Sequence, residues 1–295
     1  MQQESQAAII RIMFAGLLAL AVVYWPGIHG IFFIDDVVSF EGLLHVKDFP
    51  SAVYYVFTGN TGPLGRPVAL ASFLLHDGAY PNNPLPFLSA NIAIHLSNIA
   101  LLAWAGRRLQ IQTPSLLGTS IWLAPIVSLL WGALPILAST SLMAVQRMTS
   151  LSALFMLLGV HSYLYARVKA REQNCLGLLA AIIGIGLSTL LAMFTKENGA
   201  LLPLLLLAMH YLLFVKDKGA SGGVNPSNAY SRPLAVALCL PSLLLLAYIV
   251  SRIPSIEARY WNRPFTLSER LASEVVILWE YLRVAFLPRF ADMSP

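Results

Sequence analysis

The sequence predicts an all-α integral membrane protein, a polytopic bundle of about seven or eight transmembrane helices with a large first outer loop. Hydrophobic residues make up 57% of the 295 residues, whereas charged residues make up only 11%. A soluble domain carries roughly 25% charged residues, so this much apolar surface must face lipid. The net charge of +5 comes from cations that form no continuous basic tract, so nucleic acid is not an expected partner.

The apolar segments have the length that a membrane requires. A bilayer core about 30 Å thick needs roughly 20 apolar residues per helix. Seven such segments are residues 8–25, 86–106, 116–137, 149–166, 176–194, 199–215 and 233–250. Residues 271–288 are an eighth, weaker candidate, because Glu274, Glu280 and Arg283 interrupt them. An interfacial or protein-packed helix is the alternative interpretation of this segment.

Basic residues distinguish the two sides of the predicted membrane domain. The connections after the second, fourth and sixth spans carry Arg107, Arg108, Arg167, Lys169, Arg171, Lys216, Lys218 and Arg232. The short connections on the other side carry only Arg147 and Lys196. Because short basic loops stay in the cytoplasm, we expect a cytoplasmic amino terminus in a cell inner membrane. Residues 1–295 then form one domain, with an outer loop at 26–85, a cytoplasmic linker at 216–232 and an outer tail at 251–295.

Two adjacent carboxylates, Asp35 and Asp36, follow the first span and an aromatic cluster. Carboxylate oxygens are ligands that Mg²⁺ and Mn²⁺ accept, so the pair can hold a divalent metal. Alternatively, one carboxylate can act as a general base. A solvated loop or a helix cap is the interpretation that involves no chemistry.

Two arginines lie at the same predicted face. Arg66, in a Gly-Arg-Pro sequence, can hold a phosphate through two parallel hydrogen bonds or can serve as an interfacial cation. Arg147 lies in a tight outer turn, where Thr149 or Ser150 is a candidate cap of the next helix. The start of a helix attracts anions, so we expect Arg147 to face an anionic ligand there.

Lys196 and Glu197 form the next outer turn. Neighbouring residues on a helix do not face one another, so each of the two is expected to have a separate partner. Further along, Arg263 and Arg270 flank a segment rich in aromatic residues, in which Thr266 or Ser268 is the expected helix start. These two cations can contact a phosphate or sugar at the headgroup region, or can simply anchor the segment there.

The second predicted span carries a polar stripe. Asn91, His95 and Asn98 are spaced at i, i+4 and i+7, so they share one helix face. We expect this stripe to connect helices through hydrogen bonds.

Taken in chain order, these motifs resemble a known family. They are Phe-Ile-Asp-Asp (33–36), Gly-Arg-Pro (65–67), Asn91…His95…Asn98, Val-Gln-Arg-Met-Thr-Ser-Leu (145–151), Lys196-Glu197 and Arg-Pro-Phe-Thr-Leu-Ser-Glu-Arg-Leu (263–271). The series resembles bacterial relatives of the transmembrane-and-TPR-containing protein O-mannosyltransferases, in the GT-C glycosyltransferase superfamily. The resemblance covers nearly the whole chain, and it implies a GT-C-like helical fold.

The resemblance implies a polyprenyl-phosphate sugar as donor and a protein Ser/Thr hydroxyl or a glycan as acceptor. It maps the essential carboxylate onto Asp35 or Asp36, and it maps neutralisation of the donor phosphate onto Arg66, Arg147 and Lys196. Glu197, His95, Arg263 and Arg270 are supporting candidates. A divalent metal, Mg or Mn, is the one cofactor considered.

The chain departs from the family pattern in two respects. GT-C enzymes usually have more spans, and these relatives often end in TPR repeats, so we expect a short or truncated member whose turnover is in doubt. The alternative function is a non-catalytic polytopic protein, such as a carrier of lipid-linked sugars or an assembly subunit. Convergence of the outer charged residues on one space favours the enzyme, whereas separate environments favour the subunit.

Overall fold

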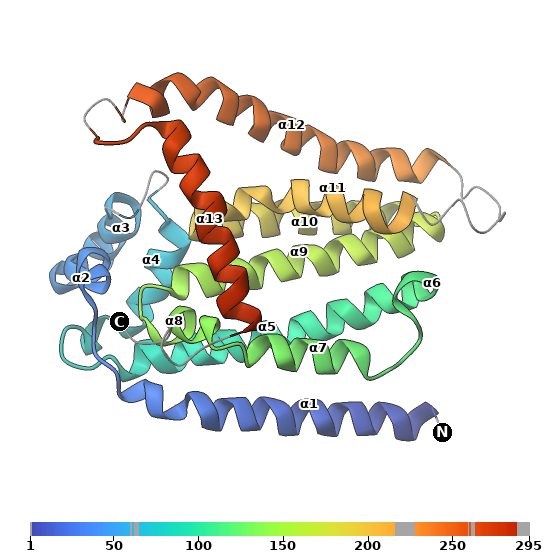
Figure 1. Cartoon of the computed structure of the whole chain (residues 1–295), viewed down its shortest axis with the longest axis horizontal. Helices are drawn as coiled ribbons and strands as arrows, with labels where there is room; N and C mark the ends of the chain where they lie inside the picture. The colour runs from blue at the N-terminus through green and yellow to red at the C-terminus, as the bar shows by residue number, and fades with distance from the viewer. Residues whose placement is uncertain are drawn as a thin grey trace.

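The computed structural model describes residues 2–59, 61, 65–215, 228–258, 260 and 263–287, and these residues form helices joined by turns. Figure 1 shows long helices running side by side between two ends of the molecule. They are α1 (Gln2–Tyr24), α5 (Leu85–Gln112), α7 (Leu123–Gly132), α9 (Arg147–Arg171), α10 (Cys175–Thr195), α11 (Leu202–His210) and α12 (Asn228–Ala258). Among the described residues, six helical segments are long and apolar enough to cross a membrane, or seven when a bent pair is included.

The predicted third span, residues 116–137, is wrong as a single helix. It consists of α7 and α8 (Ile136–Leu142), which meet at an angle of 69°, while α6 (Pro114–Leu117) is a separate short turn. Pro135 precedes α8 and cannot donate a backbone hydrogen bond, which explains the break. The Gly132 carbonyl accepts from Tyr24 Oη at 3.3 Å and from His95 Nε2 at 3.0 Å.

The eighth candidate span is not supported by its composition. The corresponding helix α13 (Leu267–Phe286) is not among the helices that are long and apolar enough to cross a membrane, because charged residues recur along its length. Thr266 begins it as predicted: its hydroxyl accepts from Glu269 N, and the Glu269 carboxylate accepts from Thr266 N. The α13 helix buries no residue.

The predicted linker at 216–232 lies largely outside the described residues, as does the end of the predicted tail. The structure describes α12 from residue 228, and α12 continues to Ala258, so the tail begins later than residue 251. The sixth predicted span, 199–215, begins with a 3₁₀ turn, η4 (Glu197–Leu201), and ends with a π turn, η5 (Tyr211–Val215).

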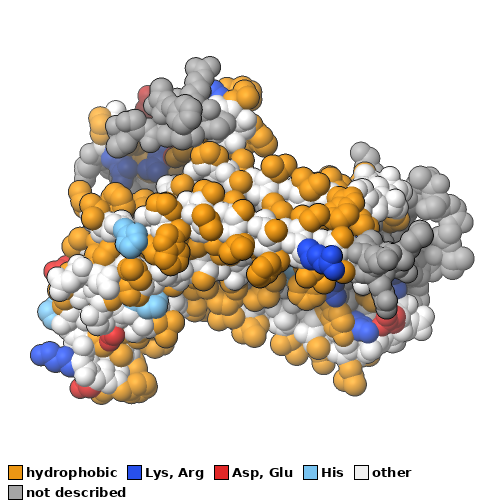
Figure 2. Space-filling model, turned by 90° about the horizontal axis from the view of Figure 1, so that it is seen from below, with side chains coloured by type: hydrophobic (Ala, Val, Ile, Leu, Met, Phe, Trp, Pro, Cys, Tyr) orange, Lys and Arg blue, Asp and Glu red, His pale blue; other side chains and the backbone are white. Residues whose placement is uncertain are grey.

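Alternation of the helices brings the predicted first outer loop and the two predicted outer turns to one end of the bundle, which we call the loop end (Figure 1). It contains η1 (Trp25–His29), α2 (Ile34–Phe40), η2 (Glu41–His45), α3 (Phe49–Thr58), α4 (Pro67–Phe73) and η3 (Leu74–Ala79). The starts of α9 and η4 lie at the same end. Figure 2 shows hydrophobic side chains along the flank of the bundle and charged side chains mainly toward its ends. This separation is what a protein in a bilayer requires.

A compact aromatic core fixes the loop end. Phe40 from α2, Phe73 from α4 and Phe87 from α5 are fully buried, and Phe40 lies 4.6 Å from Phe73 and 5.0 Å from Phe87 between ring centroids. Such ring pairs contribute about 0.5–1.5 kcal/mol each beyond the area they bury. Met148 on α9 belongs to the same cluster, so this core positions α2, α4 and α9 relative to one another.

Candidate functional site

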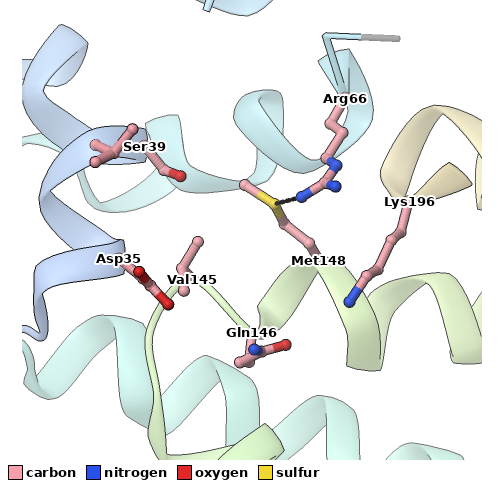
Figure 3. Close-up of a pocket in the computed structure, with 8 residues that line it drawn as sticks. Asp35, Ser39, Arg66, Val145, Gln146, Met148 and Lys196 are labelled. Carbon is pink, nitrogen blue, oxygen red and sulfur yellow. Dashed lines mark hydrogen bonds between the residues drawn. The ribbon is translucent and has the colours of Figure 1, made fainter. Parts of the chain in front are cut away.

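A cavity of about 260 Å³ lies at the loop end, beside the first long connection. Its lining comes from four parts of the chain: α2, the residue before α4, the turn into α9 and the residue after α10. The lining residues are Asp35, Val38, Ser39, Arg66, Val145, Gln146, Met148 and Lys196 (Figure 3). The structure therefore brings together Asp35, Arg66 and Lys196, which are separated by up to 161 positions along the chain.

The two adjacent carboxylates have different environments. Asp36 is fully buried, and its Oδ2 accepts from Phe33 N at 2.7 Å while its Oδ1 accepts from Val145 N at 2.6 Å. Burial raises the pKa of Asp36, and the two backbone donors oppose that increase. Asp35 is exposed and lines the cavity. Asp36 thus joins α2 to the turn before α9, and Asp35 is the carboxylate available to a ligand.

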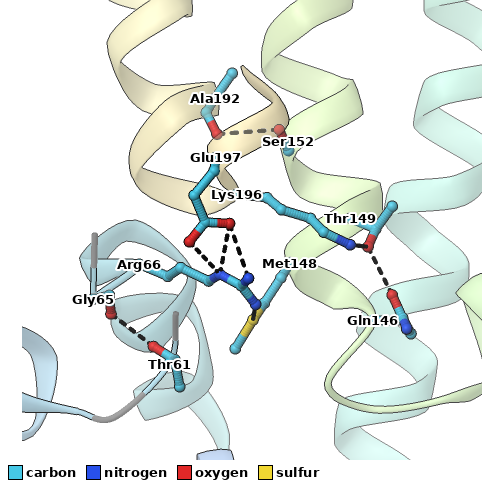
Figure 4. A network of polar contacts seen from close by, with 10 residues as sticks. All are labelled: Thr61, Gly65, Arg66, Gln146, Met148, Thr149, Ser152, Ala192, Lys196 and Glu197. Carbon is cyan, nitrogen blue, oxygen red and sulfur yellow. Dashed lines mark hydrogen bonds and ion pairs between the residues drawn. The ribbon is translucent and has the colours of Figure 1, made fainter. Parts of the chain in front are cut away.

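Arg66 is held in place by Glu197. Its Nε lies 3.1 and 3.2 Å from the two Glu197 carboxylate oxygens, and its Nη2 lies 2.9 Å from Glu197 Oε2 (Figure 4). The remaining nitrogen, Nη1, faces Met148 Sδ at 3.3 Å. Sulfur is a weak acceptor, so this edge of the guanidinium retains most of its capacity to bind an anion. Arg66 adopts the left-handed conformation (φ 49°, ψ 49°) directly before α4.

Lys196 approaches the cavity from another element. Its backbone is extended (φ −155°, ψ 140°) at the end of α10, and its Nζ donates to Thr149 Oγ1 at 2.6 Å. Thr149 in turn donates to Gln146 Oε1 at 2.7 Å (Figure 4). Burial and then repulsion from Arg66 lower the pKa of Lys196. The prediction of separate partners for Lys196 and Glu197 is confirmed.

Arg147 does not line the cavity. It is 1% exposed, and its Nε, Nη1 and Nη2 donate to Asn91 Oδ1 at 2.9 Å, Ser72 O at 2.8 Å and Phe87 O at 2.9 Å. Its guanidinium also stacks 5.0 Å from the ring centre of Phe73. The expectation that Arg147 faces an anion is therefore corrected, because it connects α4, α5 and α9 instead.

The capping prediction for Thr149 and Ser150 is also wrong, because α9 already begins at Arg147. The polar stripe, by contrast, connects helices as predicted. Asn91 donates to Met143 O at 2.8 Å and Asn98 to Ser150 O at 2.8 Å, while His95 donates to Gly132 O. His95 is consequently a structural residue rather than a part of the cavity.

The two candidate cations of the C-terminal segment lie apart from the cavity lining. Arg263 is exposed and lies 5.2 Å from the ring centre of Tyr260. Arg270 forms an ion pair with Glu274 at 3.4 Å on the exposed helix α13. Neither residue contributes to the cavity. The contact of Arg263 with Tyr260 fits the role of an anchor among aromatic residues better than the role of a phosphate or sugar ligand.

The carboxylate pair does not suit a shared metal ion. Asp36 is fully buried, each of its oxygens accepts a backbone N–H group, and it does not line the cavity, so only Asp35 of the pair presents its carboxylate there. Among the described residues, no three His, Cys, Asp or Glu side chains are grouped as metal ligands would be. We therefore derive no chemical step from a metal at this position.

Two features of the cavity were missed in the sequence. Val38 and Ser39 follow Asp35 by three and four positions, so a helical spacing through α2 would have placed them on the same face. Met148 was not assigned a role, and its contact with Arg66 spans 82 positions, which no local pattern reveals.

In the cavity the exposed carboxylate of Asp35 lies on one side and the cations of Arg66 and Lys196 lie on the other, with the apolar side chains of Val145 and Met148 between them (Figure 3). Such an arrangement can bind a group that carries both a hydroxyl and an anion. Comparisons of the chain with protein-family models, with curated proteins and with solved structures find no match.

Proposed function

We propose that this chain is an inverting glycosyltransferase that moves a sugar from a polyprenyl-phosphate donor to a protein Ser/Thr hydroxyl or a glycan acceptor. The observation that carries the proposal is the single cavity shared by Asp35, Arg66 and Lys196. A lipid-linked donor suits this position, since apolar helices border the cavity and a polyprenyl chain requires lipid. We further propose that the loop end faces the periplasm or exterior.

In this mechanism the acceptor oxygen attacks the anomeric carbon of the donor sugar, and the bond from that carbon to the phosphate oxygen breaks. Asp35 receives the proton of the acceptor hydroxyl as general base. Negative charge develops on the departing phosphate, where Lys196 and the Nη1 edge of Arg66 stabilise it. Fixed cations are effective in this role, because they need no reorganisation during the reaction.

The remaining charged residues hold this arrangement. Glu197 fixes Arg66, Thr149 orients Lys196, and Asp36 fixes the turn that carries Val145. The second candidate function, a non-catalytic carrier or assembly subunit, predicted separate environments for the charged residues. Arg147 meets that expectation, but Asp35, Arg66 and Lys196 do not.

The test uses the full chain reconstituted in liposomes with a radiolabelled polyprenyl-phosphate hexose and extracts that contain acceptors. We expect Asp35→Asn to abolish sugar transfer while circular dichroism shows unchanged helix content. Glu41→Gln, which alters an exposed carboxylate of the same end outside the cavity lining, should transfer sugar at the rate of the unaltered chain. Full activity of Asp35→Asn would exclude Asp35 as the general base. An equal loss of sugar transfer in Asp35→Asn and Glu41→Gln would point to a general effect of charge.

A further inference from the structure

A second group of cations lies at the end of the bundle opposite the cavity, where α5 and α9 finish (Figure 1). Arg108 belongs to the last turns of α5, and Arg167 belongs to the last turns of α9. Both side chains are half-buried rather than extended into solvent. A half-buried guanidinium loses part of its hydration, so its charge requires compensation from nearby groups.

Within the part of the chain that the structure describes, no carboxylate pairs with either arginine. Arg108 donates to His161 O at 3.4 Å and lies over the Trp104 ring at 5.2 Å. Arg167 donates from Nε to Gln112 Oε1 at 3.2 Å, its Nη1 lies 3.4 Å from His210 Nδ1, and its guanidinium lies 3.3 Å from the centre of the Phe214 ring. Neither arginine forms an ion pair within the described part of the chain. These partners are a backbone carbonyl, an amide, an imidazole and aromatic rings rather than carboxylates, so they do not neutralise either positive charge.

The neighbouring charges strengthen the positive potential. Lys169 pairs with Glu172 at 2.7 Å and is thereby neutralised, but Arg171 acts on Arg167 as a like charge. Gln112 joins the two helices, because it donates to Leu164 O at 3.0 Å and accepts from Arg167. Since Arg108 precedes Gln112 by four residues, it lies about 6 Å from Gln112 along α5. The two arginines therefore flank one interface on successive turns.

Aromatic residues indicate where this interface meets the bilayer. Trp104 is 55% exposed and lies one turn before Arg108, and Tyr165 is 37% exposed and lies one turn before Lys169. The Lys169 ammonium lies 5.2 Å from the Tyr165 ring, which repeats the pairing of Arg108 with Trp104. Trp and Tyr gather at the level of lipid headgroups, where their rings contact both acyl chains and water. Arg108 and Arg167 follow these aromatic residues along their helices, so both arginines lie on the water side of the aromatic level.

We propose that Arg108 and Arg167 form a binding site for the headgroup phosphate of an anionic phospholipid. Basic pockets between transmembrane helices recognise such headgroups, and an anionic lipid leaves a net charge for the two arginines to neutralise. A zwitterionic headgroup carries its own ammonium next to the phosphate, so it satisfies the site less well. The helix C-termini also favour cations, but that effect does not distinguish one lipid from another.

Native mass spectrometry of the full chain in detergent tests the site, with phosphatidylglycerol and phosphatidylcholine as probes. We expect preferential binding of phosphatidylglycerol, and the double variant Arg108→Gln/Arg167→Gln should weaken it about twenty-five-fold, since each cation contributes roughly a factor of five. Lys47→Gln, which removes an exposed cation of the loop end, should leave the affinity unchanged.

Two further measurements keep the test decisive if the double variant unfolds. Arg108→Lys/Arg167→Lys retains both charges and should bind phosphatidylglycerol more tightly than the glutamine variant or any unfolded chain. Binding to the unaltered protein should also weaken as salt is raised, because the attraction is electrostatic. Equal affinity for the two lipids, or binding that is insensitive to salt, would overturn the proposal.

Discussion

The ion pair between Arg66 and Glu197 provides the sharpest test of how the loop end is held together. It joins the residue before α4 to the start of η4 across 131 positions. Its side chains are 23% and 28% exposed, which lies between a solvent-exposed pair and a fully buried one. Exposed pairs contribute about 0.2–1 kcal/mol, whereas breaking a buried pair costs about 3–5 kcal/mol. The three contacts and the partial exposure together predict a coupling free energy of about 1–2 kcal/mol.

A double-mutant cycle measures this coupling. Arg66→Gln, Glu197→Gln and the combined variant are compared in detergent micelles by the midpoint of unfolding, with circular dichroism as the signal. The effect of the combined variant should be smaller than the sum of the single effects by the coupling energy. A coupling below about 0.3 kcal/mol would refute the bridge, since additivity within that range is typical of residues that do not interact.

The charge-swapped variant Arg66→Glu/Glu197→Arg separates stability from ligand binding. It should recover much of the stability lost in the single variants, because an ion pair can form again. It should not bind dimethyl phosphate, because a carboxylate then replaces the guanidinium edge beside Met148. If the swapped chain bound the phosphate diester as well as the unaltered chain did, Arg66 would not be an anion ligand.

The remaining predictions concern residues around the same cavity. Asp36→Asn should destabilise the chain by about 1–3 kcal/mol in the same unfolding assay, because one of two buried backbone donors loses its acceptor. Arg147→Met should cost about 3 kcal/mol or more, since it leaves the buried Asn91 Oδ1 without its donor and removes two further bonds; a loss under 1 kcal/mol would contradict the structural role. Affinity for dimethyl phosphate should fall as pH rises and Lys196 deprotonates, beginning below its usual pKa of 10.5 because burial lowers that value. Lys196→Arg should move this loss to higher pH, and calorimetric titration between pH 7 and 11 would show whether it does.

The general architecture could be predicted because it follows from local composition. Apolar segments of sufficient length imply helices that cross a membrane, and their alternation places residues 26–85, Arg147 and Lys196 at one end. The break between α7 and α8 was missed, although Pro135 follows Gly132 closely in the sequence. The segment was apolar throughout, and hydropathy alone does not report the direction of a helix.

The roles of individual charged residues could not be predicted, because they depend on partners far along the chain. Asp35 and Asp36 are adjacent and chemically alike in the sequence, and the long-range contact that distinguishes them is the backbone N–H of Val145, 109 positions away, which donates to Asp36. Arg147 resembled a surface cation in a tight turn, yet Asn91 and two carbonyls surround it. A hydropathy pattern records that these residues are polar, but it does not record whether protein or ligand satisfies them.

The charged residues of the loop end therefore divide into two groups with different consequences when substituted. Asp36, Arg147 and Glu197 direct their polar atoms to partners within the protein, so their loss should appear first as lower stability. Asp35 and Lys196 retain capacity toward the cavity, so their loss should appear first in ligand binding or turnover. Arg66 belongs to both groups, because one edge binds Glu197 and the other faces the cavity. A conservative substitution at Arg66 is thus the single change expected to reduce stability and phosphate affinity together.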